Sequence, residues 1–454
     1  MVRGSSPDGS TDVNPFVFDR PLKREQLIDR AQEIADLLDS ADGGHSVCLY
    51  APRRFGKTSL LRAVLNDADQ RLDMIPVLVD LSEILSHADF AIRLEQAYRA
   101  LRGPIARILS GMLPEVGLAV GLPGVSLRTT GKRAADDPLR TIHNLLDLPH
   151  RLFERTGRRA LIVFDEFQEL LALEGMDGVV RSHIQHHGDA ATYFYSGSEP
   201  SMLERLFADR TRPLYGQARQ MRLGVLPARQ TAEDLDVRFR SGGRDPGAVI
   251  GELVAVMNGH PQRVMLLAHY LWEEVSRSNS AGPAALTAAF ESMIRQLDTE
   301  MQATWEGLSV NERRVLSALA YGLSPQEGAA LRLTGLRSAS AAQRATQALT
   351  RRAFVERDAD GDLVIVDPVL DRWLARRHLP PMLYVLPLAK EQWIVTDGPS
   401  LAFTRSKHRT RAEAEASADE HLRQQSRGGE VSVVDVDTRD ELPDWAQGVA
   451  SLPS

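Results

Sequence analysis

The sequence predicts an α/β fold with a parallel-sheet core, followed by a helical region and two smaller domains. Short apolar runs alternate with helical patterns up to about residue 226, helical patterns alone follow to about residue 300, and strand-like runs return after Pro380-Pro381. Parallel strands covered by helices on both faces read as continuous apolar runs. A chain of 454 residues also exceeds what one hydrophobic core usually holds, so several domains are expected.

Four short runs have the apolar and β-branched character of buried strands. They span residues 46–51, 76–81, 160–165 and 191–196. The first run, SVCLYA, leads directly into PRRFGKTSLLRAVL, which has helical spacing. Beyond about Leu226 such runs stop, so we expect these four strands to complete the sheet. The single cysteine, Cys48, lies in the first run, where a buried structural thiol is expected and no internal disulfide can form.

The rest of the chain divides into smaller parts. Residues 227–300 read as amphipathic helices punctuated by glycine and proline, a predicted helical lid. Residues 301–379 read as three helices, a hairpin around Asp360-Gly361 and a short helix, an order that suits a winged helix. Residues 382–440 read as strand, strand, helix and strand, a small α+β domain. Residues 1–12 and 441–454 are predicted tails, which leaves 13–226 for the core.

A phosphate-binding pattern lies between the first predicted strand and its helix. A P-loop needs glycine, four residues, then Gly-Lys and Ser or Thr; here Ala51 replaces the first glycine. Gly56 lets the backbone amides face phosphates, Lys57 brings a charge to the β- and γ-phosphates, and Thr58 offers a hydroxyl to magnesium. An accidental Gly-Lys-Thr turn is the alternative. The predicted residues for ATP are Ala51, Pro52, Arg53, Arg54, Phe55, Gly56, Lys57, Thr58 and Ser59, and Mg²⁺ is the predicted metal.

Two carboxylates, Asp165 and Glu166, end the third apolar run. A hydrolytic P-loop enzyme needs a carboxylate at the end of a neighbouring strand for the metal and a base that orients water. Asp165, with Thr58, is therefore assigned to the magnesium shell and Glu166 to polarising the attacking water. Ser198, just beyond the fourth strand, is the predicted γ-phosphate sensor in preference to Ser196, although a simple turn explains these hydroxyls equally well.

Together these motifs resemble those of the archaeal-type ATPases of the AAA+/STAND group. The similarity covers about residues 14–378 and lies in GKTSLL after Pro-Arg-Arg, LIVFDEFQEL, the SGS strand end, Gly259-His260-Pro261 and the box-like segment 14–25. The resemblance implies an ATP-dependent regulator or motor with a lid and a winged helix. It implies that Arg263 reads the γ-phosphate, with a surface helix arginine as the alternative. It also implies that a neighbouring subunit completes the site, for which the candidates are Arg210, Arg212 and Arg219.

Arginines gather on the predicted third helix of residues 305–378. The segment holds 11 Arg and nine acidic residues, so its net charge is only +2 (11 − 9). Arg337, Arg344 and Arg351 are seven residues apart, nearly two helical turns, so they would share a face. The corresponding helix of a helix-turn-helix enters the major groove, which makes DNA a candidate partner. A solvated face or a surface that docks on the ATPase core is the alternative.

Other patterns limit the classes of function. His183, His186, His187 and Asp189 are the other candidate metal cluster, but without a cysteine or a zincin glutamate a polar helix end explains them. The apolar window 105–127 is broken by charged residues, glycines and prolines, so no membrane span is predicted. A net charge of −7 argues against a chain that coats nucleic acid with its whole surface. Without a secretory signal, a cytoplasmic protein is expected.

The sequence therefore predicts an ATP-binding and ATP-hydrolysing regulatory ATPase. Its nucleotide cycle would control the winged helix and a partner, which is DNA, another protein or further copies of the chain. The alternative is an ATP-dependent switch or DNA-binding scaffold that turns over negligibly. Both hypotheses share the same nucleotide pocket.

Overall fold

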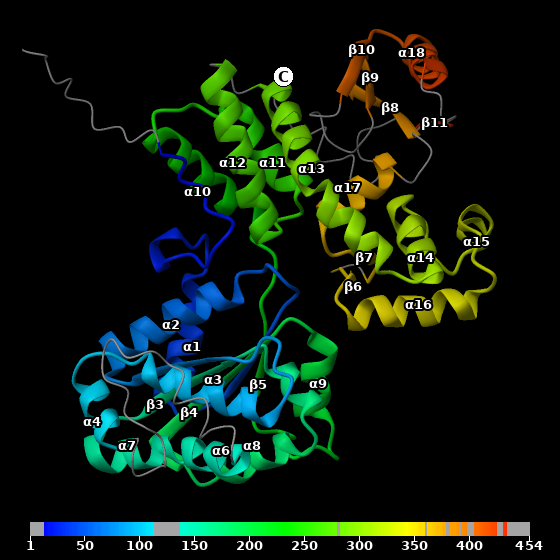
Figure 1. Cartoon of the computed structure of the whole chain (residues 1–454). Helices are drawn as coiled ribbons and strands as arrows, with labels where there is room; N and C mark the ends of the chain where they lie inside the picture. Colours follow the sequence, from blue (N-terminus) through cyan, green and yellow to red (C-terminus); the bar gives the residue numbers. More distant parts are fainter. Residues whose placement is uncertain are drawn as a thin grey trace, which may run out of the picture. The chain divides into compact units, whose positions relative to one another are not determined.

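The structure of the chain is a computed structural model. It describes residues 13–112, 137–278, 282–358, 361–377, 382–389, 392–396, 404–424 and 430–433. The chain divides into two compact units, one of residues Pro21–Gly224 and one of residues Met1–Arg20 with Val225–Ser454. Figure 1 shows the elements of both units.

A five-stranded parallel sheet forms the centre of the Pro21–Gly224 unit. Its order is β2 (Ile75–Asp80), β3 (Ala160–Asp165), β4 (Ala191–Gly197), β1 (Val47–Tyr50) and β5 (Arg219–Arg222). The α/β prediction and the four predicted strands are confirmed. Every residue of β3 and β4 is buried, because helices cover both faces of the sheet.

The prediction that four strands complete the sheet is wrong. β5 pairs with β1 at the edge of the sheet. Two hydrogen bonds of 2.9 Å mark the ends of this pairing, from Arg219 N to Ser46 O and from Leu223 N to Tyr50 O. Its sequence, Arg-Gln-Met-Arg, is mostly exposed. A polar edge strand carries no continuous apolar run, so periodicity alone could not reveal it.

Helices pack on both faces of the sheet, with α1 (Ala31–Asp42) and α2 (Lys57–Leu72) on one of them (Figure 1). On the other face, buried side chains of several helices join those of the strands in one cluster, which also holds Cys48. Cys48 is buried, as predicted, and its burial raises the pKa of the thiol to about 12. These helices are α3 (His87–Arg99), α4 (Pro104–Met112), α6 (Pro138–Leu146), α7 (Leu148–Thr156), α8 (Met176–Ile184) and α9 (Pro200–Ala208).

The second unit contains a helical region after Val225. It contains α10 (Ala228–Ser241), α11 (Ile250–Val256), α12 (Pro261–Ser278) and α13 (Pro283–Glu306). Residues 13–20 pack with these helices, because the Phe16 ring lies 4.7 Å from that of Phe239 and 6.0 Å from that of Trp272. Asn14 Nδ2 also donates to His269 O, at 3.1 Å. The core therefore begins at Pro21 and not at the predicted residue 13.

A helix–hairpin segment follows and has the predicted order of elements. It consists of α14 (Val310–Ala320), α15 (Gly328–Thr334), α16 (Ala339–Arg351), β6 (Val355–Arg357), β7 (Leu363–Ile365) and α17 (Pro368–Arg377). β6 and β7 are antiparallel. The buried Trp373 of α17 donates through Nε1 to Asp298 of α13, at 2.8 Å, which joins the segment to the helical region.

The prediction that Arg337, Arg344 and Arg351 share one face of a helix is wrong for Arg337. Ser338 caps the helix by accepting a hydrogen bond from Ala341 N (3.2 Å), so the helix begins at Ala339. Arg337 therefore precedes the helix, while Arg344 and Arg351 lie on it and are exposed. Side-chain capping, which a seven-residue spacing does not detect, decides this boundary.

The last described elements form a four-stranded sheet with one helix. β8 (Met382–Ala389) pairs with β9 (Gln392–Thr396) and with β11 (Glu430–Val433), and α18 (Arg411–Gln424) precedes β11. The sequence prediction missed β10 (Thr404–His408), which is antiparallel to β9 and has the polar sequence TRSKH. The strand at this edge again has no apolar run that periodicity could detect.

None of the helices in the described part of the chain combines the length and apolar character of a membrane span. Residues 113–127 of the apolar window 105–127 lie outside that part.

Candidate functional site

The predicted nucleotide residues meet at one edge of the parallel sheet. β4 lies between β1 and β3, and the P-loop follows β1, Asp165 ends β3, and Ser198 follows β4. The carboxyl ends of parallel strands point to the same edge, which is where open α/β sheets bind ligands. The topology therefore brings together segments that are more than 100 residues apart in the sequence.

Two residues of the P-loop have a left-handed backbone conformation. Gly56 caps α2 with φ of +87°, a conformation that glycine adopts without steric cost. Arg54 also has a positive φ, of +70°, whereas Ala51 is not among the residues with positive φ. The alanine that replaces the first P-loop glycine therefore needs no left-handed conformation, and the departure from the motif does not strain the loop.

Lys57 places a buried ammonium group inside the loop. Its side chain is 5% exposed, and Nζ donates to Ala51 O at 2.9 Å and to Pro52 O at 3.0 Å. Burial lowers the pKa of Lys57, while the charges of Glu166 and Asp165 act in the opposite direction. A phosphate oxygen could replace the two carbonyl acceptors, since all three groups accept from an ammonium.

The two predicted metal ligands are in direct contact. Thr58 Oγ1 donates to Asp165 Oδ2 at 2.7 Å, across 107 residues of sequence. Asp165 is 5% exposed, and its Oδ1 accepts from Glu166 N at 3.2 Å. A hydroxyl and one carboxylate are the kind of protein ligands that Mg²⁺ takes beside the phosphates of a nucleotide. The pair therefore fits the predicted metal.

Glu166 and Ser198 also meet. Ser198 is 1% exposed, and its Oγ and N donate to Glu166 Oε2 at 2.7 and 3.2 Å. Ser196 is buried, and its hydroxyl has no hydrogen-bond partner among the described residues. Ser198, which the sequence analysis preferred, is thus the serine beside the carboxylate, while its role as a γ-phosphate sensor stays a prediction.

The remaining loop residues differ in their surroundings. Pro52 and Phe55 are buried, whereas Arg53 and Arg54 are exposed. The hydroxyl of Ser59 accepts a hydrogen bond from Leu22 N at 3.0 Å. Ser59 therefore holds the chain at Leu22 against α2, a contact that the motif did not indicate.

Sequence analysis missed Gln168, a buried neighbour of this site. It lies in the 3₁₀ helix η2 (Phe167–Ala172), and its Nε2 donates to Glu166 Oε2 at 2.6 Å. A single polar residue in a short 3₁₀ helix has no periodicity that reveals the direction of its side chain, so only its place two residues after Glu166 could have drawn attention to it.

Arg263 lies in the second unit, on α12, and is fully buried. The alternative of a surface helix arginine is therefore wrong. Nε donates to Asp367 Oδ1 at 3.0 Å, and Nη2 pairs with Asp367 and with Glu300 of α13. Burial would raise the pKa of Asp367, but the charge and the hydrogen bonds of Arg263 outweigh it and lower that pKa. Arg263 thus joins the helical region to the start of α17.

The three candidates for an arginine that acts in a neighbouring subunit differ in their surroundings. Arg212 pairs with Asp177 at 3.3 Å, and Arg219 Nη2 donates to Ser40 Oγ at 3.1 Å. Arg210 is exposed, in the turn that follows α9. Whether any of the three acts in a neighbouring subunit stays a prediction.

The histidine pattern is structural. His183 contacts Asp147 Oδ1 through Nδ1 (2.6 Å) and His143 Nδ1 through Nε2 (2.7 Å), and buried His187 bonds to the hydroxyl of Tyr193. Among the residues that the structure describes, no three His, Cys, Asp or Glu side chains are placed to hold a metal ion. The zinc interpretation of His183, His186, His187 and Asp189 is therefore not supported.

His187 makes the Pro21–Gly224 unit sensitive to acid. Burial lowers its pKa to about 4, from an unperturbed value near 6.5. Between these values the unfolded chain binds a proton that the folded chain does not, so stability falls as the pH falls. We expect the free energy of opening β4 to drop by about 2 kcal/mol between pH 7.5 and pH 5 because of this residue. Hydrogen exchange of the β4 amides, corrected for intrinsic rates, measures the drop.

The matched control for this prediction is a second histidine. His187→Gln should lose that part of the pH dependence, whereas His150→Gln, at an exposed position, should keep it. Equal pH dependence in wild type and His187→Gln would contradict the assignment.

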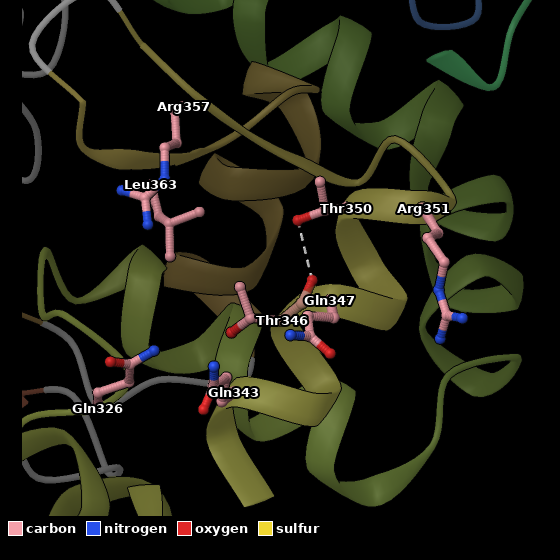
Figure 2. Close-up of a pocket in the computed structure, with 8 residues that line it drawn as sticks. All are labelled: Gln326, Gln343, Thr346, Gln347, Thr350, Arg351, Arg357 and Leu363. Atoms are coloured by element: carbon pink, nitrogen blue, oxygen red, sulfur yellow. Dashed lines mark hydrogen bonds between the residues drawn. The ribbon is translucent and has the colours of Figure 1, made fainter. Parts of the chain in front are cut away.

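The helix–hairpin segment contains a separate cavity of about 520 Å³ between α16 and the hairpin. Figure 2 shows Arg357 and Leu363 of the hairpin beside Thr346 of α16, with Arg351 turned away from them. The hydroxyl of Thr346 is buried and has no partner among the described residues. None of the described lining residues is acidic; they are Gln326, Gln343, Thr346, Gln347, Thr350, Arg351, Arg357 and Leu363.

The sheet order and the loop after β1 give the chain an α/β fold that solved structures share. The Walker-type ATPase PABY2304 of Pyrococcus abyssi is similar with a TM-score of 0.59 and 21% identity, over 79% of this chain and 99% of that chain. The ORC2 protein of Aeropyrum pernix is similar with a TM-score of 0.50 and 15% identity, over 80% and 95%. At these identities the similarity establishes the fold. No protein-family model and no curated protein matches the chain.

Proposed function

We propose that the chain binds ATP with Mg²⁺ at the carboxyl edge of the sheet and hydrolyses it to ADP and phosphate. One observation carries the proposal: the 2.7 Å contact between Thr58 and Asp165. It joins the P-loop to the acidic end of β3, beside a buried lysine and a second carboxylate. If the Gly-Lys-Thr sequence were an accidental turn, no contact between Thr58 and Asp165 would be expected.

The side chains have distinct roles in this proposal. Bound MgATP supplies the phosphoanhydride bond that is broken and the metal charge that offsets its negative charge. Lys57 exchanges its two carbonyl partners for phosphate oxygens, and the amides of the loop face the phosphates. Thr58 and Asp165 hold the metal. Glu166 orients the attacking water and accepts its proton, while Ser198 holds Glu166 and senses the γ-phosphate.

Nucleotide titration with and without Mg²⁺, followed by measurement of phosphate release, tests the proposal. We expect magnesium-dependent ATP binding and continuous phosphate release. ATP binding without phosphate release would favour the alternative, a switch that turns over negligibly. Absence of magnesium-dependent binding would contradict both functions.

Arg263 must give up a buried ion pair before it can carry the proposed regulatory role of the nucleotide cycle. It follows Gly259-His260-Pro261 and holds Asp367, the residue that precedes α17. If Arg263 reads the γ-phosphate, it exchanges the carboxylates of Asp367 and Glu300 for phosphate, and the contact with the winged helix changes with the nucleotide. The protein partner, another chain or a further copy of this one, stays a prediction, and Arg210, Arg212 and Arg219 stay the candidates that a copy would contribute.

DNA binding by the winged helix is the second candidate function. The cavity between α16 and the hairpin favours it, because amide, hydroxyl and guanidinium groups line it and none of its described lining residues is acidic. Glutamine and arginine are the side chains that bind base edges and phosphates. The exposed Arg344 and Arg351 extend this surface, with Arg337 just before the helix.

Replacing Arg344 with alanine is expected to weaken DNA binding in a salt-dependent way. If Arg344 contacts a phosphate, its removal should reduce the slope of log affinity against log salt by about one. Gel-shift titrations at several salt concentrations give the slope. Arg229→Ala is the matched control, since Arg229 is exposed but lies on α10 and pairs with Glu233. An unchanged slope in Arg344→Ala would contradict the contact.

A further inference from the structure

Gln168 is a buried polar side chain beside the proposed base, and the roles proposed above do not use it. It is 2% exposed, and it is the polar residue among the three buried residues of η2, which are Phe167, Gln168 and Leu170. Its contact with Glu166 Oε2, at 2.6 Å, identifies the amide nitrogen, because an ionised carboxylate accepts and cannot donate. The same nitrogen lies 3.5 Å from Ser198 Oγ.

The donors around Glu166 converge on one of its two oxygens. Gln168 Nε2, Ser198 N and Ser198 Oγ all donate to Oε2. Among the described residues none donates to Oε1. Glu166 also has a positive φ, of +54°, so its backbone turns away from the line of β3 where the side chain begins. The three bonds hold one oxygen in place and leave the other available to accept a proton from water.

Gly197, the last residue of β4, makes room for the Gln168 side chain. A Cβ at this position would lie 2.1 Å from Gln168 Oε1 and 2.8 Å from Leu203 Cδ1. Gly197 is not among the residues with positive φ, so its backbone conformation does not require glycine, but a Cβ here would force Gln168 and Leu203 to move. The side chain of Gln168, in η2 after β3, therefore fills the space beside Gly197 at the end of β4.

The amide oxygen of Gln168 is not stabilised by this placement. Gln168 Oε1 is buried and has no hydrogen-bond partner among the described residues. A buried acceptor without a partner costs free energy that an apolar side chain of the same length would avoid. A residue selected for packing alone would be apolar, so the bond from Nε2 to Glu166 is the contact that explains a glutamine.

We propose that Gln168 is a positioning residue for Glu166: together with Ser198 it holds Oε2 so that Oε1 faces the water that attacks ATP. This inference rests on the proposed hydrolysis. It assigns Gln168 no contact with nucleotide or metal. Its loss should therefore lower kcat and leave ATP affinity unchanged, because a misplaced base slows only the step in which the base acts.

Gln168→Met in the full chain tests the role. Methionine has a similar length, but it has no hydrogen-bond donor and no amide oxygen that burial would leave without a partner. We expect kcat for phosphate release to fall about 10- to 100-fold, because the base is less well oriented. The dissociation constant for MgATP should stay within about twofold of wild type. The melting temperature should stay equal or rise. A purely structural glutamine would instead show a lower melting temperature and normal turnover per folded molecule.

Two further variants complete the comparison. Leu170→Met, at a buried position of the same 3₁₀ helix, controls for repacking and should turn over like wild type. Gln168→Asn keeps an amide donor on a shorter side chain and should recover part of the rate that Gln168→Met loses.

A double-mutant cycle with Glu166→Gln measures whether the effect of Gln168 depends on Glu166. If Gln168 acts through Glu166, the double variant should be no slower than Glu166→Gln alone. A double variant slower by the product of the two single effects, or wild-type kcat in Gln168→Met, would overturn the positioning role while leaving hydrolysis intact. Wild type that binds MgATP but releases no phosphate would overturn both proposals, and this outcome is seen before any variant is compared.

Discussion

Replacing Glu166 with glutamine is expected to reduce phosphate release by about 10²- to 10⁴-fold, the usual contribution of a general base. Glutamine has nearly the same shape and can still meet Ser198, but it cannot accept a proton from water. Because the proposal assigns the metal to Asp165 and Thr58, and not to Glu166, MgATP should bind as tightly as before. Phosphate release and the dissociation constant, measured on the same preparation, separate the two effects.

The matched control for Glu166→Gln is Glu174→Gln, which changes another glutamate that follows β3 but has no role in the proposed site. It should turn over like wild type. Equal phosphate release by wild type and Glu166→Gln would remove the role that we give this carboxylate, whereas loss of binding in Glu166→Gln would mean that the residue takes part in holding the nucleotide.

Lys57→Ala is expected to abolish phosphate release and to weaken MgATP binding by at least about 30-fold. A charge-assisted hydrogen bond contributes roughly 1.5–3 kcal/mol, and Lys57 is placed to make more than one with the phosphates. Lys57 is buried and its pKa is lowered by that burial, so its removal also takes away a poorly solvated charge. The variant should therefore stay folded. Nucleotide titration and thermal unfolding measure the two quantities.

Lys57→Met serves as a second variant that fills more of the space, and Lys23→Ala, at an exposed position of the same unit, serves as the control. Lys57→Met should lose binding as Lys57→Ala does. If both variants bound MgATP like wild type, the P-loop assignment would fail, and with it the hydrolytic function and the switch alternative.

The fold could be predicted where burial leaves a local signal. β1, β2, β3 and β4 are runs of apolar residues because helices cover the sheet, and Gly56 and Lys57 stand at the strand-to-helix turn that a P-loop requires. The polar strands β5 and β10 gave no such signal, since an edge strand is held by backbone hydrogen bonds that any side chain permits. The cap at Ser338 likewise set the start of α16 without changing its periodicity.

The candidate site could be predicted as a set of residues but not as an arrangement. Lys57, Thr58, Asp165 and Glu166 carry their chemistry in the sequence, and the structure places them at one edge of the sheet. The sequence favoured Ser198 over Ser196 by its place beyond the strand end, and the structure shows that the Ser198 hydroxyl reaches Glu166. Gln168 was missed, because the direction of its side chain depends on the space left by Gly197.

By itself the sequence determined the α/β class and four strands of the core, and it supplied the residues that we propose bind phosphate, magnesium and water, because burial and motif spacing are local properties of the chain. Tertiary structure alone decided that Thr58 meets Asp165, that Gln168 and Ser198 share Glu166, and that Arg263 is buried against Asp367. Contacts of this kind depend on sheet order and side-chain packing between distant segments, which no local pattern records.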